Sequence, residues 1–156
     1  MNHVIKNIKY GQHLELIEPI THPLVEVLMR HYLEKSWPEA IIPIPLHKKK
    51  IRVRGFNQSL LLAKVITSLL PEDIPCLLRP GIVTKHRDTL SQQSLPARAR
   101  HKNIKGAFTV EKNICYKHVA IIDDVVTTAE TANEVSKELK RNGIQQVDIW
   151  CLARTP

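Results

Sequence analysis

The chain has 156 residues, enough for one domain with a sizeable core, and its 43% of hydrophobic residues is ordinary for a soluble protein. No stretch approaches the roughly 18 apolar residues of a membrane span and no secretory signal is evident, so we expect a cytoplasmic protein. The net charge is +8, and the two basic segments 47–54 and 85–105 carry +5 each, which indicates an anionic partner such as a phosphorylated ligand or a nucleic acid.

The three cysteines, Cys76, Cys115 and Cys151, lie far apart in apolar stretches and form no C-x-x-C pair. This usage is typical of free thiols in a reducing cytosol rather than of disulfides or a zinc site. We predict that all three thiols are buried.

The first 36 residues are mainly helical by pattern, with Leu24, Leu28 and Tyr32 at helical spacing and a start at Thr21 to Pro23. The abrupt opening of the chain suggests that a piece is missing upstream. We therefore divide the chain into a helical segment, 1–36, as the remnant of a longer N-terminus, and an α/β domain, 37–156.

The next segment, 39–47, is an apolar run interrupted by two prolines. Because proline is disfavoured inside a central strand, we predict a strand that ends near Pro43 or Ile44. A stiff loop then carries the basic run, which either contacts a ligand or nucleic acid or is a solvated surface. Asn57 is a good N-cap for an amphipathic helix that ends before Pro71.

Residues 75–83 read as a second strand, and 106–110 return to a strand pattern. Between them, 84–105 is polar, basic and too long for a tight connection. Loops of this length are usually active-site lids or disordered, so we expect a lid or binding loop here.

An apolar strand over 117–123 ends on two adjacent acids, Asp123 and Asp124, and a threonine-rich turn leads into a helix over 128–142. A last strand follows at 146–152. The apolar run looks buried on both faces, as in a parallel sheet. Alternating strands and helices predict a doubly wound, mainly parallel α/β sheet with helices on both faces.

Ligands of such sheets bind at the carboxyl ends of the strands. Asp123 and Asp124 can accept hydrogen bonds from sugar hydroxyls there, and the turn before the helix offers hydroxyls and free N–H groups to a phosphate. The pattern therefore predicts a sugar-phosphate site. The competing interpretation, solvated acids at a strand end, does not account for the threonine-rich turn.

Three blocks of residues resemble the ComF family of competence-associated proteins, whose domain is similar to type I phosphoribosyltransferases. The blocks are 43–47 with 54–58, 87–108, and 123–131, and the resemblance covers about residues 8–154. It implies the phosphoribosyltransferase fold with a long flexible lid at 85–105. It also implies phosphoribosyl pyrophosphate or a nucleotide as ligand, single-stranded DNA and the competence machinery as partners, and it leaves self-association open.

By this resemblance, Asp123 and Asp124 bind the ribose hydroxyls and are the candidate catalytic residues. Mg²⁺ is implied as a cofactor that is held by the phosphoribosyl pyrophosphate, without a direct protein ligand. The expected ribose and 5′-phosphate site comprises Asp123, Asp124, Val125, Thr127, Thr128, Ala129, Glu130 and Thr131. The candidate contacts to pyrophosphate or nucleic acid are Lys50, Arg52, Arg54, Gly55, Arg87 and Arg100.

The chain departs from the family pattern in three places. Most members have glycine where this chain has Ala129; if that backbone needs a positive φ, alanine costs on the order of 1 kcal/mol. Glu130 suits the helix dipole by about 0.3–1 kcal/mol but repels a phosphate unless it points away. The family's N-terminal four-cysteine zinc module is missing, so we expect a truncated, domain-only or split form.

Three functions remain open on these residues. The first is a ComF-like protein of DNA uptake with a phosphoribosyl pyrophosphate site. The second is an active Mg²⁺-dependent phosphoribosyltransferase of unknown acceptor. The third is a regulator that binds a nucleotide without turnover.

Overall fold

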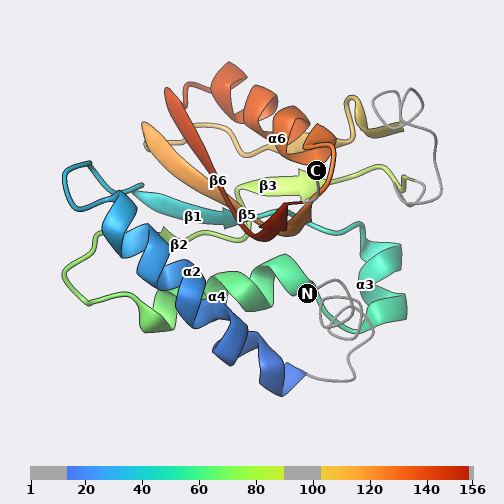
Figure 1. Cartoon of the computed structure of the whole chain (residues 1–156). Helices are drawn as coiled ribbons and strands as arrows, with labels where there is room; N and C mark the ends of the chain where they lie inside the picture. Colours follow the sequence, from blue (N-terminus) through green and yellow to red (C-terminus); the bar gives the residue numbers. More distant parts are fainter. Residues whose placement is uncertain (1–13, 90–102, 155–156) are drawn as a thin grey trace.

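A four-stranded parallel sheet in the order β2-β1-β5-β6 lies at the centre of the protein, and a small antiparallel pair, β3-β4, accompanies it (Figure 1). The computed structural model describes residues 14–89 and 103–154. The elements are η1 (Leu14–Leu16), α2 (Ile17–His31), β1 (Ala40–Pro43), α3 (Lys48–Arg54), α4 (Gln58–Leu69), β2 (Leu77–Leu78), β3 (Val83–Lys85), β4 (Phe108–Val110), β5 (His118–Val126), α6 (Glu130–Arg141) and β6 (Gln146–Arg154).

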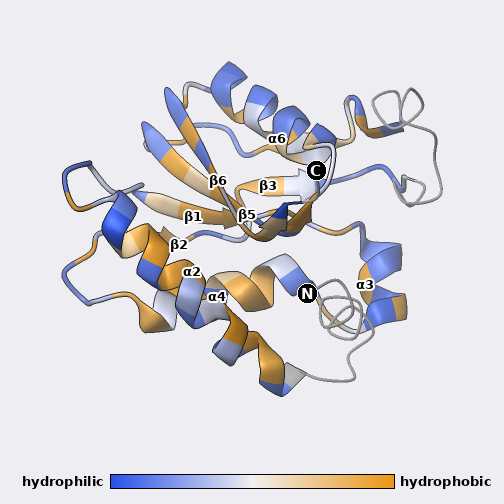
Figure 2. Ribbon diagram, viewed as in Figure 1, coloured by the Kyte–Doolittle hydropathy of each residue, from blue (hydrophilic) through white to orange (hydrophobic). Residues whose placement is uncertain are grey.

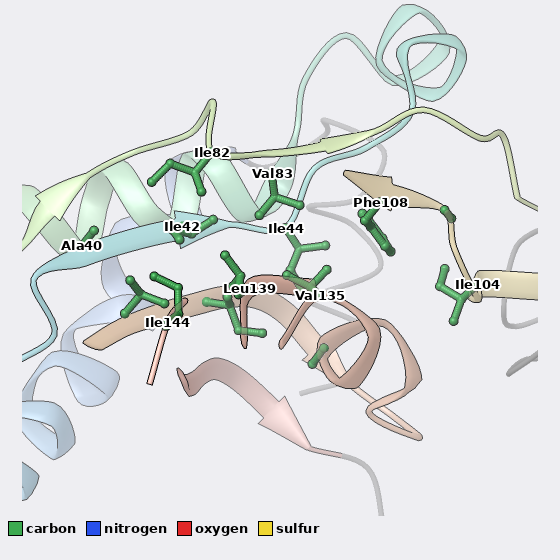
Figure 3. Close-up of a cluster of buried hydrophobic side chains, with 14 residues drawn as sticks. Ala40, Ile42, Ile44, Ile82, Val83, Ile104, Phe108, Val135, Leu139 and Ile144 are labelled. Carbon is green, nitrogen blue, oxygen red and sulfur yellow. The ribbon is translucent and has the colours of Figure 1, made fainter. Parts of the chain in front are cut away.

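β5 lies between β1 and β6 and is covered on both faces. Successive residues alternate between two cores: Ile121 belongs to the cluster that contains Val135 and Leu139 of α6, whereas Ile122 belongs to the cluster formed with α2 and α4. Figure 3 shows the first cluster between the sheet and α6, with Phe108 of β4 and Ile104 toward one side of it. These two layers of helices confirm the predicted doubly wound α/β architecture.

α2 begins at Ile17, ahead of the predicted start at Thr21 to Pro23, and Pro23 lies inside the helix. Thr21 is not an N-cap, because its hydroxyl donates to the carbonyl oxygen of Ile17 at 2.5 Å. Ile17 and Thr21 are both buried. The buried stripe of the helix therefore extends one turn further back than the spacing of the larger apolar residues indicated.

The side chains of Tyr32 and Asp148 tie the end of α2 to the sheet. The Tyr32 hydroxyl donates to Asp148 Oδ2 at 2.5 Å and accepts from Trp150 Nε1 at 3.1 Å, and His118 Nε2 lies 2.8 Å from the same carboxylate oxygen. Burial by itself raises the pKa of Asp148, but the hydrogen bonds from Tyr32 and His118 outweigh it and lower the pKa below its usual value. This network fixes α2 against the amino-terminal ends of β5 and β6, away from the carboxyl ends where a ligand would bind.

The basic run after β1 is a short helix, α3, rather than the predicted stiff loop. His47 caps its start by accepting a hydrogen bond from the Lys49 backbone N–H at 3.3 Å, and Gly55 ends it in the left-handed region at φ 84°. Lysine and arginine are good helix formers, so two suitable ends suffice to fold the run. No residue of α3 is buried, and its ribbon is largely hydrophilic (Figure 2).

The single strand predicted over 75–83 is wrong, because two separate strands occupy this region. β2 pairs with β1 at the edge of the main sheet, whereas β3 pairs with β4. Pro80 and Gly81 form a turn that separates them. Of the predicted lid, 84–105, the central part 90–102 with Arg100 lies outside the described residues.

The prediction of three buried thiols holds for one cysteine. Cys76 is buried and Cys151 half-buried, but Cys115 is exposed in the connection between β4 and β5. The apolar neighbours of Cys115 in the sequence do not bury it, because a connection on the surface leaves its side chain in solvent. Among the described helices, none is long and apolar enough to cross a membrane.

Candidate functional site

β5 continues through both acids instead of ending at Asp123. Its pairing with β6 runs on from Asp123 opposite Cys151 to Val126 opposite Arg154, and α6 then begins at Glu130. A small open hollow of about 20 Å³ lies at this junction. Its lining consists of Asp123, Val125, Val126, Thr127, Ala129, Glu130, Thr131 and Ala132.

The predicted ribose and phosphate residues therefore surround one hollow, with two exceptions. Asp124 and Thr128 are not part of the lining. Asp124 is half-buried, and its Oδ1 accepts a hydrogen bond from the Val125 backbone N–H at 2.8 Å. Thr128 is exposed in the turn. The sequence placed these residues in one segment, but the pleat of β5 and the turn decide which of them face the hollow.

The carboxyl group of Asp123 is held from two sides. The Ser59 hydroxyl, near the start of α4, donates to Oδ1 at 3.2 Å, and the Asp124 backbone N–H donates to the same oxygen at 3.0 Å. Burial, followed by the charge of Asp124, raises the pKa of Asp123 to about 7. Near neutral pH this group can accept a hydrogen bond as a carboxylate or donate one as an acid.

Ala129 adopts the left-handed backbone conformation at the start of α6, with φ 57° and ψ 8°. This is the strained case that the sequence identified, in which glycine would be favoured. Ala129 makes no side-chain cap for α6, so the turn presents backbone N–H groups rather than a capping side chain. Glu130 lines the same hollow, so its charge acts on any anion bound there.

The basic helix α3 follows β1, which lies beside β5 in the sheet. The Ile44 backbone N–H donates to the carbonyl oxygen of Ile122 at 2.9 Å, so the chain leaves β1 next to the two acids. Lys50 Nζ donates to the carbonyl oxygen of Thr89 at 2.7 Å, and His47 Nδ1 lies 3.8 Å from Asp88 Oδ1. α3 is thereby attached to the segment after β3.

The other predicted cationic contacts differ in their surroundings. Arg52 is exposed and Arg54 is half-buried on α3, while Gly55 ends that helix. Arg87 Nη2 donates to the carbonyl oxygens of Asn103 at 3.0 Å and Lys105 at 2.7 Å. Arg87 therefore links the two sides of the connection that contains 90–102, which is a structural task in addition to any contact with a ligand.

Three residues at or near the site were missed from the sequence. Ser59 contacts Asp123 and could have been found, because it is the second residue after the predicted N-cap Asn57. Buried Glu134 accepts a hydrogen bond from the Gly106 backbone N–H at 2.6 Å and so holds the end of the long connection on α6. Buried Lys85, at the end of β3, carried no sequence signal that separated it from the other basic residues.

No group of three or more His, Cys, Asp or Glu side chains that could hold a metal ion occurs within residues 14–89 and 103–154. Asp123 lines the hollow and Asp124 is its neighbour on β5, so two adjacent carboxylates lie at this end of the strand. They suit hydroxyl donors or a cation that a ligand brings with it.

Comparison with known proteins finds clear relatives. The chain is 37% identical over 154 residues to the DNA utilization protein YhgH of Shigella flexneri, an alignment that covers 97% of this chain and 66% of that protein. It is 43% identical over 120 residues to competence protein F of Haemophilus influenzae, with coverage of 75% and 51%. The chain thus spans 66% or less of the length of these relatives. No protein-family model matches the chain.

Solved structures agree with the fold that the strands and helices form. A purine phosphoribosyltransferase from Pyrococcus horikoshii is similar with a TM-score of 0.50 at 20% identity, over 88% of this chain and 72% of the other. A hypoxanthine phosphoribosyltransferase from Trypanosoma cruzi, complexed with the product IMP, is similar with a TM-score of 0.53 at 12% identity, over 92% and 75%. The fold is therefore that of the type I phosphoribosyltransferases.

The strain at Ala129 predicts that Ala129→Gly stabilises the protein. Relief of the left-handed alanine outweighs the greater freedom of glycine in the unfolded chain, so we expect a gain of about 0.5–1 kcal/mol in the free energy of unfolding. Chemical denaturation measures it. The matched control Ala132→Gly, inside α6, should instead lose about 1 kcal/mol or more. Equal losses in both variants would contradict the assigned strain.

The raised pKa of Asp123 predicts a pH-dependent effect of Asp123→Asn. In the folded protein this group resists ionisation, so its contribution to stability is complete below about pH 4 and is lost as the pH rises through about 7. The variant should match the wild type near pH 4 and be more stable by about 1–2 kcal/mol at pH 8. Denaturation at several pH values tests this, with exposed Asp73→Asn as a control that shows no such trend.

Proposed function

This chain belongs to the ComF family, and from that premise we propose that it binds a phosphoribosyl ligand and acts in DNA uptake or utilisation. Its relatives are a competence protein and DNA utilization proteins, which supports the link to DNA. Phosphoribosyl pyrophosphate is the ligand that best fits the residues of the hollow. A nucleotide has the same phosphate and ribose groups and is the alternative ligand.

One arrangement carries the proposal: the carboxylate of Asp123 and the turn before α6 border the same hollow. Ribose hydroxyls can donate to the carboxylates of Asp123 and Asp124. A 5′-phosphate can accept from the hydroxyl groups of Thr127 and Thr131 and from the backbone N–H groups that open α6. One short segment thus provides acids for the ribose hydroxyls and hydrogen-bond donors for the phosphate, the two kinds of group that a sugar phosphate requires.

Asp123 and Glu130 make the hollow acidic, so a polyanionic ligand requires cations. We propose Lys50 of α3 as one source of positive charge and Mg²⁺ as the second. Mg²⁺ typically binds through one or two carboxylates together with substrate phosphates, and the pair Asp123 and Asp124 fits that donor set. When bound, it would neutralise charge on the pyrophosphate; the ligand's own oxygens would supply most of its coordination.

The second candidate is a Mg²⁺-dependent phosphoribosyltransferase of unknown acceptor. Here the position of Asp124 next to Asp123 favours catalysis, because a carboxylate there could stabilise positive charge that develops on the ribose as pyrophosphate departs. No protein nucleophile is needed. Release of pyrophosphate in the presence of purine and pyrimidine bases would identify an enzyme, whereas binding without release would identify a regulator.

Calorimetric titration with phosphoribosyl pyrophosphate and Mg²⁺ tests the ligand site. We expect saturable binding, and Thr127→Val should weaken it about tenfold because one hydroxyl is removed from a charged phosphate. The matched control Thr109→Val changes an exposed threonine in β4 and should bind as the wild type does. Absence of heat at millimolar ligand would contradict the proposed site.

Binding of fluorescent single-stranded DNA tests the link to nucleic acid. Exposed Lys49 and Arg52 on α3 offer charge to phosphates, so the double variant Lys49→Gln, Arg52→Gln should bind more weakly and with a shallower salt dependence. The control pair Lys137→Gln, Lys140→Gln removes the same charge from α6. If the wild type binds no DNA at about 50 mM salt, direct DNA binding is refuted, while the ligand site is unaffected.

A further inference from the structure

The two edges of the main sheet differ greatly in length. β2 at one edge has two residues, whereas β6 at the other has nine, and no described strand pairs with its outer side. Proteins usually protect a sheet edge with a short strand, a proline, a charge or a bulge. β6 contains no proline, its pairing with β5 keeps one register throughout, and its part from Ile149 to Ala153 carries no charge.

The outer backbone groups of β6 come from its odd-numbered residues. The Gln146 backbone N–H donates to the carbonyl oxygen of Lys117 at 3.0 Å, so the even-numbered residues of β6 direct their backbone groups toward β5. Alternation along the strand then directs the N–H and C=O groups of the odd-numbered residues outward. These residues are Val147, Ile149, Cys151 and Ala153.

The side chains along this edge are apolar but incompletely covered. Val147 packs against the cluster under α6, while Trp150 and Leu152 belong with the cluster under α2 and α4, so both faces of β6 are apolar. Ile149 is nevertheless 40% exposed, and Cys151 is only half-buried. The helices therefore cover the two faces of β6 but leave its outer rim accessible to a further strand.

We propose that β6 pairs antiparallel with β6 of a second copy of this chain, which joins the two main sheets across a two-fold axis. Charge sets the register. Asp148 and Arg154 are the only charged residues of β6, and they lie opposite each other across the pair when Cys151 is at the axis. The side chain of Asp148 is 25% exposed, so its carboxylate is accessible to the arginine of the second copy.

The same register matches the apolar residues. Ile149 faces Ala153 of the second copy, and Trp150 faces Leu152, so apolar side chains oppose apolar ones. The outward backbone groups of odd-numbered residues then meet one another, as antiparallel pairing requires. A shift by two residues in either direction no longer places Asp148 opposite an arginine. The alternative occupant of this edge is a strand of a different protein, in which case this chain alone is monomeric.

Sedimentation equilibrium of the chain in reducing buffer tests the pairing. We expect a dimer at about 100 µM chain, and Ile149→Lys should weaken it at least about tenfold because a lysine at the edge disfavours a further strand. Leu77→Lys is the matched control, since it changes an exposed residue on the opposite edge and should dimerise as the wild type does. Thermal unfolding checks that each variant is folded.

Arg154 tests the register through charge, and it also serves if Ile149→Lys does not fold. Arg154→Glu places like charges opposite each other at both ends of the paired strands, so it should weaken the dimer about tenfold. Arg154→Lys keeps the charge and should retain the dimer. High salt should reduce the difference between these two variants.

Cys151 gives an independent readout of the register. Opposed residues of an antiparallel pair have Cα atoms about 4.5–5.5 Å apart, within the range of a disulfide, whereas a shift by two residues separates the two cysteines to about 7–8 Å. Cys115→Ser removes the exposed thiol. Oxidation of this variant with copper phenanthroline should give a covalent dimer that a reductant dissociates, and the double variant Cys115→Ser, Cys151→Ser should give none.

Two results would overturn the proposal. One is a monomer at about 100 µM chain in the wild type. The other is a dimer that Ile149→Lys and Arg154→Glu leave unchanged, or in which Cys151 forms no crosslink, because such a dimer does not use β6 in this register. Neither result bears on the ligand site, which the calorimetric titration tests separately.

Discussion

The pairing of β5 between β1 and β6 is the constraint on which the site depends. It buries Ile121 and Ile122 on opposite faces, so the strand has no freedom to shift its register. The acids that follow are then carried to the edge where β1 also ends. Ser59, in the first turn of α4, donates a hydrogen bond to Asp123 at this edge. The same sheet that provides the core thus holds the carboxyl group of Asp123 in a defined place.

Charge at this edge is balanced between elements rather than within one of them. The hollow before α6 is lined by Asp123 and Glu130, whereas the basic run forms α3. The elevated pKa of Asp123 shows that this group is held in surroundings that disfavour its charge. Such strain is typical of binding sites, where a ligand relieves it.

Local chemistry explains where sequence reasoning succeeded and failed. The strand 117–123 and the helix from Asn57 were predictable, because apolar runs and an N-cap act within a few residues. The basic run was mistaken for a loop, since its folding as α3 depends on a His47 cap and on Gly55 at both ends. The two strands around Pro80 and Gly81 belong to different sheets, because β2 pairs with β1 and β3 pairs with β4. The residues of 75–83 alone do not determine this pairing, since the partner strands are distant in the sequence.

By itself, the sequence determined the doubly wound class and the resemblance to the ComF family, and it identified the segment of the proposed site, because periodicity and a short motif are local properties. It also identified Ala129 as the residue at which a positive φ would cost free energy. Tertiary structure alone decided that φ is indeed positive there, that Ser59 holds Asp123, and that Lys85 is buried over the ring of Phe108. The reason is physical: burial and electrostatic contact between residues far apart in the chain exist only after the strands have paired and the helices have packed.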